Sequence, residues 1–120
     1  MIKEFKVNFT EKEISLIYQK VKDYSWDSIK NLEGWEHGTN KKYLKELCDY
    51  WITKFNWNKH QSDINNFENY TTDIDGIKIH FIKKKGSSEN SEPLLLMHGW
   101  PGSILEFLHI IEKLTHPEKF

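Results

Sequence analysis

The sequence predicts an α/β fold in two parts, a helical and extended N-terminal leader over residues 1–69 and the first strands and helix of a sheet-containing domain over residues 70–120. Three observations predict this organisation. Apolar residues recur at helical spacing through most of the first part. The second part begins with two β-branched runs around a turn. It continues with a short apolar run, a glycine-containing turn and another helical pattern, an order typical of α/β domains.

The composition excludes several classes of protein. The chain has 120 residues, with 17 lysines and no arginine against 18 acidic residues, so its formal net charge is −1. This balance gives no reason to expect nucleic acid or an anionic membrane as a partner. The single cysteine, Cys48, cannot form an intramolecular disulfide, which fits a reducing compartment. No apolar run is long enough to span a bilayer, and the N-terminus does not resemble a signal peptide. We therefore expect a soluble cytoplasmic protein.

The leader is predicted to begin with an extended arm and a capped helix. Residues 3–9 alternate between apolar and polar, which is typical of an extended segment with one buried face. Thr10 and Glu13 have the spacing of a capping box, in which each side chain bonds the backbone of the other residue. A helix is expected over about residues 11–24, with one apolar face made of Ile14, Ile17, Val21 and Tyr24.

A second helix is predicted after an irregular segment over residues 25–39, in which Trp26 and Trp35 are interpreted as packing anchors. Asn40 is a suitable N-cap for this helix. Its apolar stripe consists of Tyr43, Leu44, Leu47, Cys48, Trp51 and Phe55. Within that stripe the cysteine is interpreted as a buried structural thiol rather than a nucleophile. A third, short helix is expected over about residues 58–67.

The second part is predicted to begin with a β-hairpin. Asp75-Gly76 is a two-residue turn signal between β-branched runs. A lysine-rich polar loop over residues 83–93 follows, and its lysines are expected to end a strand rather than to bind phosphate. Leu94–Met97 is apolar on both faces, which suits a buried strand. Residues 104–114 are again helical in pattern, and Pro117 ends that helix.

The segment best suited to chemistry is the turn between this strand and this helix, His98–Ser103. A strand-to-helix junction exposes backbone N–H groups at a helix N-terminus, where negative charge is favoured. Gly99 and Gly102 permit a tight turn, and Trp100-Pro101 is a candidate cis peptide. Preorganised donors of this kind form an oxyanion hole. An ordinary strand-to-helix turn without a catalytic role fits the six residues equally well.

No metal site and no cofactor are expected. His80 and His98, with Asp75 nearby, are the candidate ligands, but their spacing matches no zinc pattern and no cysteine pair accompanies them.

Several motifs together resemble a known family. Leu94–Ser103, followed by Glu106-Phe107, is similar to the first loop of epoxide hydrolases in the α/β-hydrolase superfamily, and Trp100 is typical of the microsomal and juvenile-hormone-like branch. The upstream half resembles the N-terminal domain of that branch. Its matching motifs are Tyr50-Trp51, Phe55-Asn56-Trp57, Asn65-Asn66-Phe67, Thr72–Gly76 and Ile79-His80-Phe81. The resemblance extends from about Phe5 to Pro117.

This resemblance implies a two-step hydrolysis of a small-molecule epoxide, and with it epoxide metabolism and detoxification. An aspartate nucleophile opens the epoxide to give an ester, and a histidine with an acidic partner activates the water that cleaves the ester. Two lid tyrosines protonate the epoxide oxygen. The Trp100 backbone N–H would be one donor of the oxyanion hole, and its indole would wall the substrate pocket. His98, Gly99, Pro101 and Gly102 would shape the loop, no cofactor or metal takes part, and the leader can contribute to a homodimer.

One departure limits what the chain can do by itself. The family's nucleophile lies in a later turn of the type Gly-x-Asp-x-Gly, and none of the six aspartates of this chain lies in such a turn. The lid tyrosines and the catalytic histidine would also lie downstream. We therefore expect the chain to be the front portion of an epoxide hydrolase and to be inactive alone. Asn56-Trp57-Asn58 also replaces the Asp-Trp-Arg that is usual in the family, so an ion pair is expected to be missing there.

Two alternative functions remain open from the sequence. A haloalkane or ester hydrolase would use the same oxyanion turn but would not be expected to carry this leader. A non-enzymatic module that docks on another chain would need neither nucleophile nor base.

Overall fold

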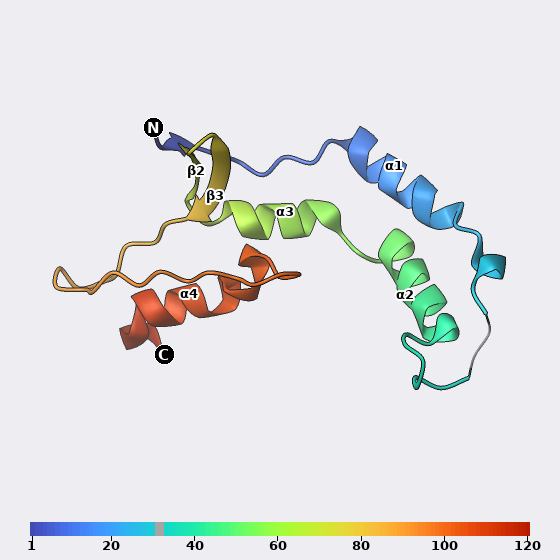
Figure 1. The fold of residues 1–120 in the computed structure, drawn as a ribbon. Coiled ribbons are helices and arrows are strands. Elements are labelled where there is room, and N and C mark those ends of the chain that lie inside the picture. Colours follow the sequence, from blue (N-terminus) through green and yellow to red (C-terminus); the bar gives the residue numbers. More distant parts are fainter. Residues whose placement is uncertain (31–32) are drawn as a thin grey trace. The chain divides into compact units, whose positions relative to one another are not determined.

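A computed structural model describes residues 1–30 and 33–120 of the chain. Residues 31–32, which belong to the segment expected to be irregular, lie outside the described residues. The helices and strands are, in chain order, β1 (Lys3–Glu4), α1 (Glu11–Lys22), α2 (Lys41–Thr53), α3 (Trp57–Asn65), β2 (Asn69–Ile74), β3 (Ile77–Ile82) and α4 (Leu108–Thr115) (Figure 1). The three predicted leader helices are therefore present, with ends that differ from the predictions by two residues or fewer.

The chain divides into two compact units. Unit 1 contains Met1–Asn8 and His60–Phe120, and unit 2 contains Phe9–Lys59. The expected boundary near residue 70 concerns the leader and the sheet-containing domain, and it stays a prediction.

In unit 2, α1 begins with the predicted capping box. The Glu13 backbone N–H donates to Thr10 Oγ1 at 3.2 Å, and the Thr10 backbone N–H donates to Glu13 Oε2 at 2.8 Å. This backbone hydrogen bond, together with one from the Thr10 hydroxyl, lowers the pKa of the Glu13 carboxyl. Ile14 on the inner face of α1 is buried.

The predicted cap of α2 and the two tryptophan anchors are also present. Asn40 Oδ1 accepts the backbone N–H of Tyr43 at 3.1 Å. The Trp35 ring lies 5.2 Å from the Tyr43 ring, and the Lys45 ammonium lies 5.5 Å from the centre of the Trp26 ring. Both indoles therefore contact a residue of α2.

Asn56 replaces an expected charge at the start of α3. Its Oδ1 accepts the backbone N–H of Lys59 at 2.9 Å, so it caps the helix. The Trp57 ring meets the rings of Phe9 and Phe55 edge to face, at 5.5 and 5.3 Å between centroids. Among the described side chains, the Trp57 Nε1 is a buried donor without a hydrogen-bond partner.

In unit 1, the sheet is antiparallel in the order β1-β2-β3, with Lys3 opposite Thr71 and Asn69 opposite Ile82. Asp75 and Gly76 join β2 to β3 with φ values of 50° and 79°. Positive φ at both central residues is the requirement of the hairpin turn that Asp-Gly predicts, so the predicted hairpin is confirmed.

Two asparagines hold the N-terminal arm and the sheet. Asn65 brackets Val7: its Oδ1 accepts the Val7 N–H at 2.9 Å and its Nδ2 donates to the Val7 carbonyl at 2.8 Å. Asn69 is 4% exposed, and its Nδ2 donates to the carbonyls of Ile64 and Phe67. Because both amide protons are used in this way, Asn69 Oδ1 is the group left to pair with His80 Nε2 at 2.9 Å.

Two expectations for the second part were wrong. Leu94–Met97 is not a strand, because a strand needs a ladder partner and no described segment pairs with it. Its side chains are exposed to between 37% and 80%. The helix expected over residues 104–114 is divided into a 3₁₀ turn, Ile104–Glu106, and α4. The backbone N–H of Phe107 bonds the carbonyl of Ile104, a tighter i to i+3 bond than an α-helix makes.

The lysine-rich loop is tied to the end of α4. Lys84 Nζ lies 2.9 Å from Glu112 Oε1, and this pairing lowers the pKa of the Glu112 carboxyl. The Ser87 N–H donates to the Thr115 carbonyl at 2.8 Å, and the Ser87 hydroxyl donates to Glu118 at 2.9 Å. Lys84, one of the three lysines at residues 83–85, thus forms an ion pair within unit 1.

Candidate oxyanion turn

The six residues singled out by the sequence form a closed turn in front of the 3₁₀ segment. The backbone N–H of Gly102 donates to the carbonyl of Gly99 at 2.6 Å, so Trp100 and Pro101 are the two central residues. The peptide bond between them is cis, as the sequence predicted.

The Trp100 side chain of this turn lies in solvent. Its relative exposure is 97%, so the indole packs against nothing in the described parts of the chain. Its backbone N–H donates to no group within residues 1–30 and 33–120. A free and exposed N–H in a turn closed by its neighbours is available to an external oxygen.

His98 and the two glycines differ in what surrounds them. His98 Nδ1 lies 3.3 Å from the carbonyl oxygen of Gly99, and the ring is exposed. A Cβ on Gly99 would meet nothing within 4 Å. A Cβ on Gly102 would overlap Glu106 Oε1 and would lie 2.8 Å from the Gly99 carbonyl oxygen. Of these two turn glycines, Gly102 is therefore the one that close contact with its surroundings requires to be glycine.

A second capping box follows the turn. The Leu105 N–H donates to Ser103 Oγ at 3.3 Å, and the Ser103 N–H donates to Glu106 Oε1 at 3.2 Å. From the sequence, Glu106 was identified only as part of a motif that resembles the family, and no structural role was predicted for it. The signal that could have assigned it a structural role is the spacing Ser-x-x-Glu, the same pattern that identified the box of α1.

The other candidate ligand groups have structural partners. His80 pairs with Asn69, and burial lowers the pKa of its imidazole. Asp75 forms the hairpin turn. Within the described parts of the chain, no three side chains among His, Cys, Asp and Glu are grouped as a metal site would require.

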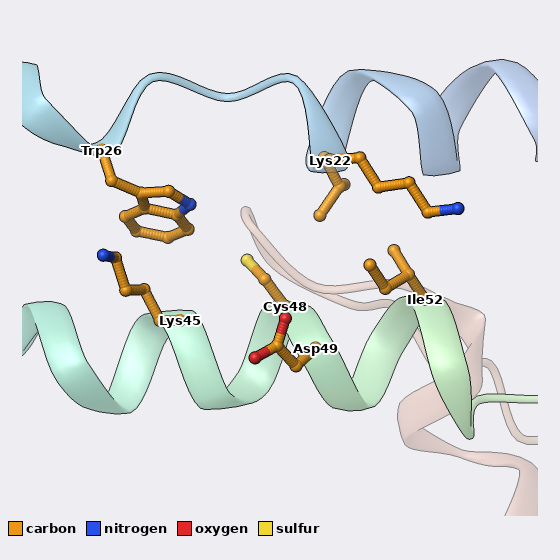
Figure 2. Close-up of a pocket in the computed structure, with 7 residues that line it drawn as sticks. Lys22, Trp26, Lys45, Cys48, Asp49 and Ile52 are labelled. Carbon is orange, nitrogen blue, oxygen red and sulfur yellow. The ribbon is translucent and has the colours of Figure 1, made fainter.

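A pocket lies in unit 2, away from the turn residues in the sequence. It has a volume of about 300 Å³ and is open to solvent between α1 and α2 (Figure 2). Its lining residues are Val21, Lys22, Trp26, Lys45, Cys48, Asp49 and Ile52. Cys48, expected to be buried, is half-buried at this pocket. None of the residues proposed for the oxyanion turn contributes to it.

No helix in the described parts of the chain combines the length and the apolar character that crossing a bilayer requires.

The solved structures that this chain resembles are epoxide hydrolases with the α/β-hydrolase fold. The crystal structure of juvenile hormone epoxide hydrolase from the silkworm Bombyx mori matches 95% of this chain, with a TM-score of 0.86 and 29% identity. The structure of Aspergillus niger epoxide hydrolase matches 100% of the chain with a TM-score of 0.80, and at 23% identity this shows the fold alone.

The sequence comparisons agree. The family model for the epoxide hydrolase N terminus matches residues 2–107, so the chain belongs to the epoxide hydrolase family. It is 35% identical over 97% of its length to a putative epoxide hydrolase of Stigmatella aurantiaca, and 35% identical over 98% to epoxide hydrolase 1 of Sus scrofa. It is also 36% identical over 97% to juvenile hormone epoxide hydrolase 1 of Ctenocephalides felis. The chain spans 26% or 27% of the length of these relatives.

Proposed function

We propose that this chain supplies the leader and one half of the oxyanion hole of an enzyme that adds water to a small-molecule epoxide to give a vicinal diol. The observation that carries this proposal is the free backbone N–H of Trp100, held in a closed and exposed turn. The family membership supports epoxide hydrolysis over haloalkane or ester hydrolysis, which could use the same turn.

The proposed reaction has two steps, and the turn acts in the second. In the first step an aspartate carboxylate attacks an epoxide carbon, the C–O bond breaks, and a lid tyrosine protonates the leaving oxygen. In the second, a histidine takes a proton from water, and the resulting hydroxide attacks the carbonyl carbon of the aspartyl ester. The carbonyl oxygen then becomes negative. The N–H of Trp100 and that of the residue after the nucleophile would donate to it, and one such donor contributes about 10²–10³ in rate. When this tetrahedral intermediate collapses, the ester C–O bond breaks, the aspartate carboxylate is restored, and the leaving oxygen takes the proton held by the histidine, which releases the diol.

The other turn residues would hold this donor in place and shape the substrate site. Gly99 and Gly102 close the turn through their 2.6 Å hydrogen bond, and Pro101 lies inside it. The Trp100 indole, which is exposed, would form one wall of the epoxide pocket. His98 would orient the entry to the turn through its contact with the Gly99 carbonyl. No cofactor or metal is assigned a step.

Residues 1–120 are proposed to be inactive by themselves, because the nucleophile, the base and the lid tyrosines of this mechanism are contributed by other segments of the family's chain. The leader–domain boundary near residue 70, a cytoplasmic location and a homodimer that includes the leader are parts of the same proposal. So is a role in the detoxification of epoxides.

A chimaera tests the proposed function. Residues 1–120 replace the matching N-terminal part of Bombyx mori juvenile hormone epoxide hydrolase, which keeps its own remaining segments. We expect this chimaera to hydrolyse juvenile hormone, and residues 1–120 alone to leave it unchanged. A folded chimaera without hydrolysis would contradict the proposal. A matched chimaera carrying Glu92→Ala, a change in the polar loop before the turn, controls for the effect of substitution as such.

A further inference from the structure

We propose that Glu106 is a positioning residue that fixes the Gly99–Gly102 turn and thereby the direction of the Trp100 N–H. The inference rests on the proposed function, because the donor that it positions is the proposed oxyanion donor. Glu106 itself is not assigned contact with the substrate or with the reacting atoms.

The carboxylate of Glu106 contacts the turn at two neighbouring positions. Its Oε1 accepts the backbone N–H of Ser103 at 3.2 Å. The same oxygen occupies the space that a Cβ on Gly102 would take. The carboxylate therefore lies directly against the Gly102-Ser103 peptide, at the point where the turn joins the 3₁₀ segment.

A hydrogen bond links this contact to the far end of the turn. The Gly102 N–H donates to the Gly99 carbonyl at 2.6 Å. Trp100 lies within the ring of atoms that this bond closes, so holding Gly102 in place also limits the rotation of the Trp100 peptide. Glu106 thus contacts Gly102, and Gly102 in turn bonds Gly99, which encloses Trp100 in the turn.

Side-chain packing offers no alternative support for the turn in the described parts of the chain. The indole of Trp100 is 97% exposed, and the rings of His98 and Pro101 are exposed as well. Hydrogen bonds must therefore fix the backbone. Within the part of the chain that the structure describes, Glu106 is the one residue outside His98–Ser103 whose side chain forms a hydrogen bond with this segment.

The test uses amide hydrogen exchange measured by NMR on the 120-residue chain with Glu106→Ala and Glu106→Gln. We expect Glu106→Ala to raise the exchange rate of the Gly102 amide about fivefold and to shift the Trp100 amide resonance, because the cap is lost. Glu106→Gln retains an oxygen acceptor and should restore both values. Glu13→Ala removes the equivalent residue of the other capping box and should leave both values unchanged.

Kinetics in the chimaera separate positioning from a general loss of structure. Single-turnover measurements give the rates at which the ester forms and breaks down. We expect Glu106→Ala to slow ester breakdown about tenfold while ester formation is unchanged, because the oxyanion donor acts in the second step. Glu106→Gln should recover most of the breakdown rate.

Two results would overturn the inference. One is unchanged exchange of Gly102 in Glu106→Ala. The other is an equal slowing of both kinetic steps, which is the mark of a structural role alone. If the unsubstituted chimaera does not hydrolyse juvenile hormone, the proposed function fails, and the exchange measurements still decide whether Glu106 fixes the turn.

Discussion

The two capping boxes of this chain share one residue pattern and have different structural consequences. Thr10 and Glu13 begin α1, a helix of 12 residues. Ser103 and Glu106 begin a 3₁₀ segment of only three residues. In both boxes the glutamate accepts the backbone N–H of the capping residue, at 2.8 Å in the first and 3.2 Å in the second.

The residues that precede the two boxes also differ in what they contact. Phe9 precedes the first box, and its ring packs against Trp57. Gly102 precedes the second, and the absence of a Cβ lets the Glu106 carboxylate lie against the backbone of the turn. A capping pattern predicts where a helical segment begins, and at the second box the glycine that precedes it also allows the capping glutamate to contact the turn.

Gly102→Ala should have the largest effect, because it changes the turn that the second capping box contacts. The added Cβ would overlap Glu106 Oε1 and lie 2.8 Å from the Gly99 carbonyl oxygen. The glutamate side chain can move, but the carbonyl belongs to the backbone, so the turn itself must open. We expect ester breakdown in the chimaera to slow about 10²-fold, comparable to the loss of an oxyanion donor. Single-turnover kinetics measure this.

Gly99→Ala is the matched control for that substitution. A Cβ at Gly99 meets nothing within 4 Å, and the residue does not have positive φ. We expect ester breakdown to change less than about threefold, since the backbone can keep its conformation. Equal losses in both alanine variants would show that close contact at Gly102 is not the cause.

Thr10→Ala should have a smaller effect, and one limited to unit 2. Loss of an N-cap costs about 1 kcal/mol of helix stability, which corresponds to about fivefold faster exchange in the first turn of α1. Amide exchange measures it, and the exchange of Gly102 should stay constant. Faster exchange at Gly102 in this variant would contradict the independence of the two boxes.

Acidification should give the smallest effect, and again in the first box. The hydrogen bond from the Thr10 backbone N–H lowers the pKa of Glu13 below its ordinary value of 4.5. A carboxyl with a lowered pKa in the folded state stabilises the fold above its unfolded pKa and loses that contribution as pH falls through its folded pKa. The Thr10 amide resonance should therefore shift as pH falls below about 4.5. Glu13→Gln has no carboxyl there and should remove the shift.

Local signals predicted much of this structure. Asp75-Gly76 predicted the hairpin turn, Asn40 predicted the start of α2, and Trp100-Pro101 was identified as a candidate cis peptide. Each of these features depends on one to four neighbouring residues, so the sequence contains the information that determines it.

Features that depend on distant residues were not predicted. Leu94–Met97 has the apolar pattern of a buried strand, but a strand also needs a partner, and none of the described segments pairs with it. The interruption of the last helix at Phe107 and the contact between Glu106 and Gly102 depend on three-dimensional geometry. For the site, the sequence therefore indicated the turn and its free N–H, and the structure identified the residue that holds it.

Replacing the Trp100 amide by an ester in the chimaera tests the central claim most directly. Incorporating the α-hydroxy analogue of tryptophan at this position removes the N–H and keeps the indole. We predict that breakdown of the aspartyl ester slows about 10²–10³-fold while its formation is unchanged. The same replacement at Met97, outside the closed turn, should change neither rate. Unchanged ester breakdown after removal of the Trp100 N–H would contradict the assignment of this turn as an oxyanion donor.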